Sequence, residues 1–582
     1  LERSIPFSSN ILTMTTINNS FKGYGKVDPA EELAFRRKTR RRVAVLAVSS
    51  VVFVAVIVGA VASIVVNSKS DSPKPNQRPP ATSLKAVCSV TQYPDSCFSS
   101  IAPLADNSTD PQAIFVSSLR VLQDSLYKLR QLPEKLSQGL NDGFLLDALN
   151  DCGSSFDDAY YSLNDTVSTV DHKAALSSSA IDDVKTWLSS VITNQQTCID
   201  SLEEASPKGQ SPTLQQAKAA MENSTEFASN SLAIVTKILD LLSTYDGERA
   251  QRKLLSKEDG VPLWVSRSLL QRRNPRPDFT VAKDGTGNFT TVAEAVAKIP
   301  NQSKRRIAIY IKAGTYNENI VLGKSAWNVM IYGDGINKTI ISGQRSVADN
   351  FTTFASATFA AVGKSFVARD ISFVNTAGAA KYQAVAFRSG SDLSVYIRCG
   401  FDAFQDTLYA HSNRQFYSNC QISGTIDFIF GNAAAVFKGC SIRAKQPMVG
   451  QFNTITAQGK VDPNQNTGIS IMNSNISGYG VVTAKTYLGR PWKNYSTTVV
   501  MQSYIGPLMS PEGWSPWIIG VTPPNTIFYG ESQNTGPGSN VSNRVKWAGV
   551  YPTLNKNQVR KYSVNSLIQG NMWIPAVTKG LL

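Results

Sequence analysis

The spacing of apolar residues divides the chain into a helical part and a strand-rich part. Between residues 84 and 245, apolar side chains recur every three to four positions, as they do along one face of an α-helix. Clear examples are Val116, Leu119, Leu122 and Leu126. Pro133 and the stretch 206–212 interrupt the pattern and separate successive helices. Several amphipathic helices joined in this way predict an all-α four-helix bundle.

From Asp278 onward, short β-rich runs alternate with Gly and Asn turns, and no long amphipathic helix interrupts them. Three similar segments, Cys399–Phe401, Cys420–Ile422 and Cys440–Ile442, follow one another at spacings of 21 and 20 residues. A period near 20 with this texture predicts the stacked coils of an all-β parallel β-helix. An antiparallel sandwich is the alternative, but it needs many two-residue hairpin turns, and the sequence has few.

Residues 43–66 form a run without any charged residue, long enough to span a bilayer. A cluster of cations precedes it: Arg36, Arg37, Lys38, Arg40, Arg41 and Arg42. Such a cluster stays on the cytosolic side, so the run predicts a transmembrane signal-anchor behind a cytosolic basic tail, 1–42. A buried core helix and a cleaved signal peptide are the alternatives; the run is long and lies deep in the chain for a signal peptide.

Shifts in composition give the remaining boundaries. A polar, Pro-rich linker is expected over 67–83, the helical domain over 84–245, a basic linker over 246–276 and the β-helix over 277–582.

The positive charge lies almost entirely in the predicted β-helix. Residues 277–582 hold 28 Lys and Arg against 14 Asp and Glu, whereas residues 1–276 hold 30 against 29. A basic domain attracts polyanions, which leaves nucleic acid, an anionic membrane and an acidic polysaccharide as candidate partners.

The seven cysteines form no Cys-x-x-Cys pair, which argues against a zinc site. Ten Asn-x-Ser/Thr sequons beyond residue 100 favour a glycosylated, extracellular protein.

The repeat also places polar residues above one another. Gln383 and Gln405 are 22 residues apart, and Asp406 and Asp427 are 21 apart, so each pair should stack on neighbouring coils. Adjacent strands lie about 4.8 Å apart, and two carboxylates that close raise one pKa, which provides a proton donor beside an ionised nucleophile. The alternative is that both aspartates only cap turns. A Ser-His-Asp triad has little support, because no Gly-x-Ser-x-Gly is present and only His411 lies in this half.

Five ordered segments resemble the signature segments of plant pectin methylesterases (pectinesterases). They are Gly314–Glu318, Gln383–Ala386, Gln405–Leu408, Asp427–Gly431 and Leu488–Trp492. The resemblance implies a right-handed parallel β-helix and a carboxylic ester hydrolase that removes methyl esters from the galacturonate C6 of pectin. It implies no metal or cofactor, and methyl-esterified homogalacturonan rather than nucleic acid as the polyanionic partner.

The resemblance also implies roles for individual residues. Asp427 is the expected nucleophile, and Asp406 the proton donor and base. Gln405 and Gln383 are expected to stabilise the oxyanion, and Arg490 to orient the nucleophile. Substrate contacts are expected from Thr353, Gln383, Arg490 and Trp492.

Residues 84–245 resemble the pectin methylesterase inhibitor domain. Three sequence segments carry this resemblance: residues 88 to 97, 150 to 152 and 185 to 188. That resemblance implies disulfides Cys88–Cys97 and Cys152–Cys198 and an autoinhibitory pro-domain. In the β-helix the family pattern favours Cys420–Cys440, although spacing alone allows Cys399–Cys420 equally well.

The basic linker carries Arg252–Leu255 and Arg267–Leu270, motifs that in this family are processing sites. A protease of the secretory pathway and separate inhibitor proteins are therefore expected partners. We expect a membrane-anchored precursor, whose processing releases the enzyme to the cell wall. Only the anchor of the unprocessed precursor is expected to contact a membrane.

A pectin lyase, a polygalacturonase and a catalytically dead binding protein are the rival interpretations. A lyase of this kind depends on calcium bound by clustered acidic residues, and the C-terminal half has few acidic residues.

Overall fold

The computed structural model describes residues 82–104, 108–171, 176–206, 211–240 and 276–577. All of them belong to one compact unit, Ala81–Leu582, in which a helical part precedes a strand-rich part. The predicted tail, the predicted signal-anchor 43–66 and nearly all of both linkers lie outside the described residues. Within the described ranges, no helix combines the length and the apolar character needed to cross a membrane.

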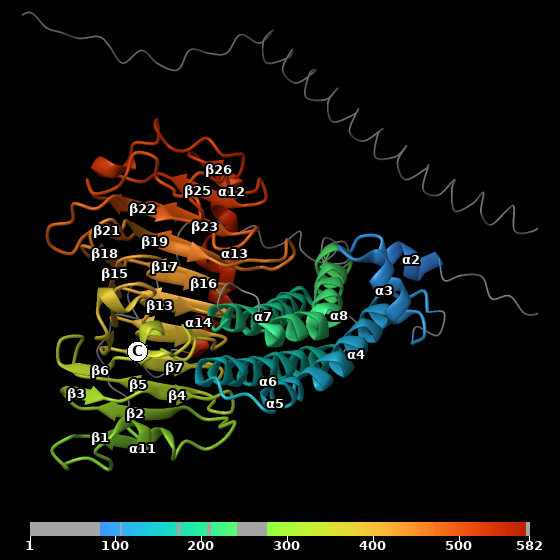
Figure 1. Cartoon of the computed structure of the whole chain (residues 1–582), viewed down its shortest axis with the longest axis horizontal. Helices are drawn as coiled ribbons and strands as arrows, with labels where there is room; N and C mark the ends of the chain where they lie inside the picture. Colours follow the sequence, from blue (N-terminus) through green and yellow to red (C-terminus); the bar gives the residue numbers. More distant parts are fainter. Residues whose placement is uncertain (1–81, 105–107, 172–175, 207–210, 241–275, 578–582) are drawn as a thin grey trace, which may run out of the picture. The chain divides into compact units, whose positions relative to one another are not determined.

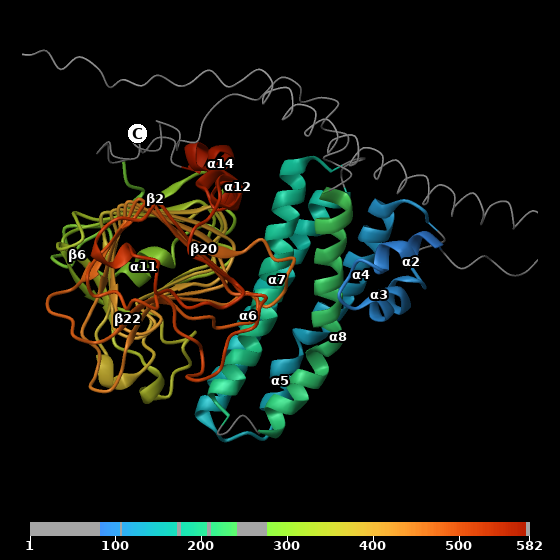
Figure 2. The same cartoon turned by 90° about the horizontal axis from the view of Figure 1, so that it is seen from above.

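The N-terminal part is helical, as the apolar spacing predicts (Figure 1). Its elements are α2 (Thr82–Cys88), α3 (Pro94–Ile101), α4 (Pro111–Leu129), α5 (Leu132–Ser137), α6 (Gly143–Asp171), α7 (Ser178–Glu204), α8 (Pro212–Ile234) and the π-helical turn η2 (Val235–Leu239). Helix α6 packs against α4 and α7, and α8 packs against α4 and α7, so the four long helices form a bundle (Figure 2).

Capping residues define where these helices begin. The Asp110 carboxylate accepts hydrogen bonds from two backbone N–H groups at the start of α4, and the Ser177 and Ser211 hydroxyls each accept one at the starts of α7 and α8. Pro111 and Pro212 occupy the first turns, where a missing N–H costs nothing.

Two disulfides cross-link the helical part. Cys88–Cys97 joins the end of α2 to α3, and Cys152–Cys198 joins α6 to α7 across 46 residues. Both are the pairs that the resemblance implies, and the second closes the longer loop, so it constrains the unfolded chain more.

The strand-rich part is a parallel β-helix of three sheets (Figure 1). Successive strands of one sheet come from successive coils, and every neighbouring pair is parallel. The predicted repeat is confirmed, because Gly400 pairs with Gln421 and Gln421 with Ser441. The sandwich alternative is therefore wrong.

The first sheet has eleven strands: β1 (Phe279–Val281), β2 (Ile307–Ile311), β5 (Val329–Tyr332), β8 (Val367–Arg369), β11 (Ser394–Ile397), β14 (Arg414–Ser418), β17 (Ala434–Lys438), β20 (Gly468–Met472), β23 (Thr497–Met501), β25 (Phe528–Ser532) and β26 (Val550–Tyr551). The second has seven: β4 (Ile320–Leu322), β7 (Phe359–Ala361), β10 (Phe387–Ser389), β13 (Leu408–Ala410), β16 (Ile429–Gly431), β19 (Asn453–Gln458) and β22 (Thr486–Gly489). The third has eight: β3 (Gly314–Asn317), β6 (Thr339–Gly343), β9 (Ser372–Asn375), β12 (Gly400–Asp402), β15 (Gln421–Gly424), β18 (Ser441–Ala444), β21 (Asn475–Gly478) and β24 (Tyr504–Ile505).

Short helices complete this part: α11 (Val292–Val296), η4 (Val347–Asp349), η5 (Ala379–Lys381), η6 (Pro537–Ser539), α12 (Lys556–Lys561), α13 (Val564–Ile568) and α14 (Gly570–Val577). Apolar residues of α13 and α14, including Ile568 and Trp573, pack with outward-facing residues of the eleven-stranded sheet such as Phe416 and Val436. This face of the sheet is thereby removed from water.

Like side chains stack along the interior of the coils. The ring of Tyr417 stacks on Tyr396 on one side and on Phe437 on the other, each with centroids 4.4 Å apart, because these residues are in register in β11, β14 and β17. Such ladders give a continuous apolar core in which each coil buries the next.

The expected Cys420–Cys440 disulfide is wrong for this structure. Cys399, Cys420 and Cys440 are all free and buried. The Cys420 thiol donates a hydrogen bond to the Tyr396 carbonyl (3.4 Å), and burial raises the pKa of both Cys420 and Cys440 well above the usual range. Because a thiol reacts through its thiolate, this environment keeps the stacked cysteines as thiols.

Candidate active site

The two predicted aspartates lie at equivalent places on adjacent coils. Asp406 precedes β13 and Asp427 precedes β16, and the register Leu408 to Ile429 places one above the other. The Asp406 N–H donates to the carbonyl of Ile426 (3.0 Å). Both aspartates have left-handed backbones, with φ of 63° and 51°, a conformation that Asp adopts more readily than most residues. The fold thus brings both carboxylates to one face, as the spacing predicts.

Asp427 lies in a fork of donors. Arg490 Nε is 2.8 Å from Oδ1 and Nη2 is 2.5 Å from Oδ2, which is a bidentate pair. The hydroxyl of Thr454 donates to Oδ1 at 2.5 Å and accepts from the Asp427 N–H at 2.8 Å. The carboxylate beside it raises the pKa of Arg490, although burial alone would lower it. These donors fix the orientation of the Asp427 carboxylate.

Asp406 has the opposite environment. Burial, above all, and then the nearby charges of Asp427 and Glu204 raise its pKa well above the usual range, while Arg490 opposes them. A carboxyl group whose pKa is raised in this way retains its proton at pH values where a free carboxyl group is ionised. The two neighbouring carboxyl groups therefore have contrasting surroundings.

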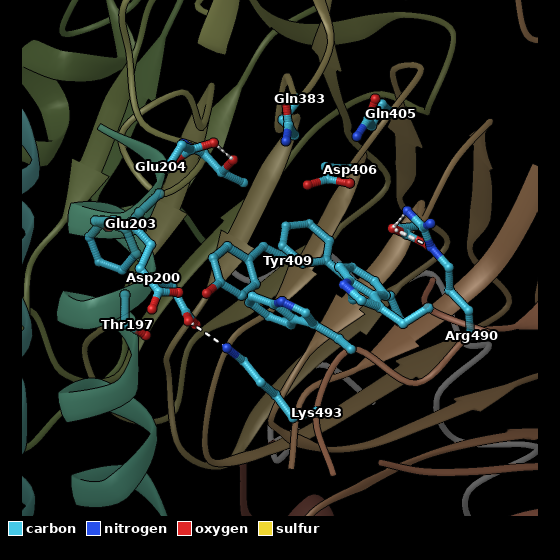
Figure 3. Close-up of a pocket in the computed structure, with 18 residues that line it drawn as sticks. Thr197, Asp200, Glu203, Glu204, Gln383, Gln405, Asp406, Tyr409, Arg490 and Lys493 are labelled. Carbon is cyan, nitrogen blue, oxygen red and sulfur yellow. Dashed lines mark hydrogen bonds and ion pairs between the residues drawn. The ribbon is translucent and has the colours of Figure 1, made fainter. Parts of the chain in front are cut away.

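The two predicted glutamines lie beside Asp406. Gln383 and Gln405 form a parallel bridge between neighbouring coils, so their side chains stack. In Figure 3 both amides and Asp406 face the same cavity. Their N–H groups are available where charge would develop on a bound carbonyl oxygen.

A cavity of about 490 Å³ connects these groups. Its residues come from both parts of the chain: Thr197, Asp200, Ser201, Glu203, Glu204, Thr353, Phe354, Gln383, Gln405, Asp406, Tyr409, Asp427, Phe430, Ala457, Arg490, Trp492, Lys493 and Trp517. All seven residues that the resemblance assigned to catalysis and substrate contact, including Thr353 and Trp492, therefore line one cavity.

Aromatic rings form one wall of the cavity. Tyr409 stacks on Phe430 with ring centroids 4.2 Å apart, and Trp492 meets both edge-on. Trp517 also lines the cavity, with the Arg490 guanidinium 4.3 Å from its ring centroid. Such rings suit the apolar faces of a sugar.

Helix α7 closes the cavity from the helical part. The Glu204 carboxylate accepts hydrogen bonds from the Thr353 N–H (2.7 Å) and hydroxyl (2.6 Å). Lys493 Nζ lies 2.6 Å from Asp200 Oδ1, and a dashed line marks this ion pair in Figure 3. Thr353, which the resemblance implies as a substrate contact, thus forms its hydrogen bonds with a side chain of the same protein.

Further ion pairs continue the contact between the two parts. Asp165 of α6 pairs with Lys364 and Asp183 of α7 pairs with Arg414, each at 2.7 Å.

The spacing of acidic residues in the helical part is a signal that the sequence interpretation missed. Asp151, Asp158 and Asp165 are seven residues apart, and Asp183 and Glu204 are 21 apart. Multiples of seven keep side chains near one face of a helix, so acidic stripes on α6 and α7 were readable. Thr454, which holds Asp427, carried no such signal.

His411 takes no part in a triad. It is buried, its pKa is lowered well below the usual range chiefly by burial, and its Nε2 lies 2.8 Å from the Thr197 hydroxyl of α7. Within the described residues, no group of three or more His, Cys, Asp or Glu side chains could hold a metal ion.

A parallel β-helix whose cavity brings two carboxyl groups together, with two amides and an arginine beside them, defines a carboxylic ester hydrolase. The chain belongs to the pectinesterase family. The family model described as Pectinesterase matches residues 278–571, and the one described as Plant invertase/pectin methylesterase inhibitor matches residues 82–234.

Relatives match over nearly the whole chain. Pectinesterase 1 of Arabidopsis thaliana is 53% identical over 574 residues, covering 96% of this chain and 98% of its own length. Pectinesterase 3 of Phaseolus vulgaris is 52% identical, covering 97% and 98%. Among solved structures, pectin methylesterase from carrot is 50% identical with a TM-score of 0.51, covering 53% of this chain and 98% of that one. The lyase, polygalacturonase and binding-only interpretations are therefore set aside.

Proposed function

We propose that this pectinesterase removes methyl esters from the C6 carboxyl groups of galacturonate in pectin, with Asp427 as the nucleophile and Asp406 as the acid and base. The observation that carries the proposal is the contrast between two stacked carboxyl groups. Asp427 lies in the fork of Arg490, whereas burial and its neighbours raise the pKa of Asp406.

In the first half-reaction, an Asp427 oxygen attacks the ester carbonyl carbon, and the carbonyl oxygen becomes an oxyanion. The side-chain N–H groups of Gln383 and Gln405 donate hydrogen bonds to it. As the intermediate collapses, the bond to the methoxy oxygen breaks and Asp406 gives that oxygen its proton, so methanol leaves. The acyl group remains on Asp427 as a mixed anhydride.

In the second half-reaction, Asp406 is ionised and accepts a proton from a water molecule as the water attacks the acyl carbon. The bond to Asp427 breaks, which restores its carboxylate and yields a galacturonate carboxyl group. Arg490 accompanies Asp427 throughout, and Trp492 supports the sugar ring as an apolar plate. Apart from the ester and one water molecule, the reaction uses only side chains of this chain.

Two substitutions test the assignment. Asp427→Asn should abolish methanol release, because an amide is not a nucleophile, and Asp406→Asn should lower it severely while pectin is still bound. Asp284→Asn is a matched control, since Asp284 is exposed and lies outside the cavity. Methanol is measured with esterified pectin on folded protein; a normal rate for either cavity variant would contradict the mechanism.

We also propose that the helical domain, 84–245, is an autoinhibitory pro-domain. Glu204 contacts Thr353 and Asp200 contacts Lys493 at the cavity. Esterified pectin and α7 therefore compete for the same cavity. The tether keeps the domain at high effective concentration, so a modest affinity suffices.

Release would require cleavage of the linker, 246–276, at Arg252–Leu255 or Arg267–Leu270 by a protease of the secretory pathway. Cleavage would also separate the enzyme from the proposed signal-anchor, 43–66, and allow its secretion to the cell wall, where separate inhibitor proteins could bind the same face. Replacing the basic residues of both motifs by Ala should leave full-length protein inside the pathway. N-terminal sequencing of wall-extracted protein that began within the helical domain would contradict this route.

A further inference from the structure

Two carboxylates of one helix face meet the enzyme at its cavity. Asp200 and Glu204 are four residues apart in the last turns of α7, so they project from the same side of the helix. Lys493 Nζ lies 2.6 Å from the first, and Thr353 donates two hydrogen bonds to the second. Both carboxylates line the cavity together with Asp406 (Figure 3).

The groups that hold these carboxylates suit an acidic sugar equally well. An ammonium group, a hydroxyl and a backbone N–H are the donors that recognise a carboxylate in any molecule. The same cavity offers Arg490 and the aromatic plates of Tyr409 and Trp492. A chain of de-esterified galacturonate, the product of the proposed reaction, presents one carboxylate per sugar to this set.

Both carboxylates are held at the cavity although burial opposes their charge. Burial raises the pKa of Asp200 and Glu204, which means that the cavity penalises their charge, and Glu204 adds to the negative charge around Asp406. A glutamine at 204 could not accept both hydrogen bonds in the same way, because Thr353 donates to two different oxygens of Glu204 and an amide has one acceptor oxygen. An asparagine at 200 would remove the ion pair with Lys493. The donors at both positions therefore select a carboxylate, either from α7 or from a competing anion.

We propose that Asp200 and Glu204 are uronate mimics: they occupy the carboxylate positions of a galacturonan chain, so that the helical domain and a de-esterified galacturonan exclude one another from the cavity. This inference rests on the proposed function. It has a regulatory consequence, because the polymer that the enzyme produces loosens its own inhibitor. Activation then increases where de-esterified galacturonan has already accumulated.

The test measures binding of a fully de-esterified decagalacturonate to the full chain by calorimetry at fixed ionic strength. This probe carries no ester and is not turned over. The double variant Asp200→Asn/Glu204→Gln should bind it at least tenfold more tightly than the unchanged protein, because its helix no longer competes through charge. The matched control is Asp124→Asn/Glu222→Gln, which removes the same charges from exposed positions of α4 and α8.

A second readout reports on the helical domain itself. Amide hydrogen exchange in peptides of α7 should increase when decagalacturonate is added to the unchanged protein, and dextran sulfate of equal charge should produce less than a third of that increase. Equal affinity in the double variant and its control would overturn the proposal. So would an equal response to dextran sulfate, since bulk charge rather than uronate mimicry would then be sufficient.

Methanol assays on the same proteins after linker cleavage separate the two proposals. If methanol is released but the double variant binds decagalacturonate no more tightly, the uronate-mimic proposal is wrong and the proposed esterase function stands. If affinity responds but no methanol is released from esterified pectin, the proposed esterase function is wrong, and the cavity is a galacturonan-binding site only.

Discussion

Thr454 should control the nucleophile although it carries no recognisable motif. Its hydroxyl both accepts from the Asp427 N–H (2.8 Å) and donates to Asp427 Oδ1 (2.5 Å), and the side chain is completely buried in β19. Thr454→Val keeps the shape of the side chain and removes both hydrogen bonds. The Arg490 pair remains, so Asp427 loses part of its fixation and not all of it.

The expected loss follows from these contacts. A hydrogen bond to a charged group contributes about 1.5–3 kcal/mol. Since about 1.4 kcal/mol corresponds to a tenfold change in rate, kcat/KM should fall by roughly 10- to 150-fold. The loss should appear mainly in kcat, because Thr454 contacts the nucleophile and does not line the cavity.

Methanol release from esterified pectin, after cleavage of the linker, measures this effect. Thr456→Val is the matched control, because the Thr456 hydroxyl is equally buried in the same strand but donates to the Leu488 carbonyl (2.9 Å) and not to Asp427. Thr454→Ser retains a hydroxyl and should restore most of the rate. Thr454 does not act through Asp427 if Thr454→Val and Thr456→Val have kcat/KM values within twofold of each other, or if Thr454→Ser is as slow as Thr454→Val.

Three further outcomes are expected. Arg490→Lys should lower kcat/KM by about tenfold or more in the methanol assay, because a single ammonium cannot reproduce the bidentate pair with Asp427; a rate within twofold would mean that charge alone suffices. Burial raises the pKa of Asp151, which contacts Thr352 across the two parts, to about 7, so Asp151 retains its proton in the assembled chain at pH values where a free carboxyl is ionised. Docking should therefore weaken as pH rises from about 4 to about 7, measured by hydrogen exchange in α6, and Asp151→Asn should flatten this dependence. Binding of polygalacturonate to linker-cleaved protein should weaken steadily as salt rises, because the β-helix is strongly basic, and a flat salt series would indicate that uncharged contacts dominate.

The sequence carried the repeating features well. A period of 20–21 residues specified stacked coils, because in a parallel β-helix an equal spacing in sequence becomes a vertical neighbour in space. The same arithmetic brought Asp406 above Asp427 and Gln383 beside Gln405. Apolar residues at helical spacing specified the bundle for the equivalent reason, since one face of each helix must be buried.

The sequence was less informative wherever a property depends on what surrounds a side chain. Identical spacing allowed a disulfide in the cysteine ladder, yet the thiols of Cys420 and Cys440 are buried and remain unpaired with each other. The different roles expected of the two aspartates were available only from the family resemblance. In the structure, burial above all raises the pKa of Asp406, whereas Arg490 and Thr454 bind the Asp427 carboxylate from coils 63 and 27 residues further along the chain.

The sequence by itself therefore determined the two folds, the stacking of Asp406 and Asp427 and the cavity residues that lie in the five motifs, since these follow from periodicity and ordered motifs. Only the tertiary structure decided that Glu204 and Asp200 occupy the cavity, 149 and 293 residues from their partners Thr353 and Lys493. The physical reason is that periodicity reports contacts within one repeating element, whereas the docking of a helix on a β-helix depends on shape and charge that two separate elements present to each other.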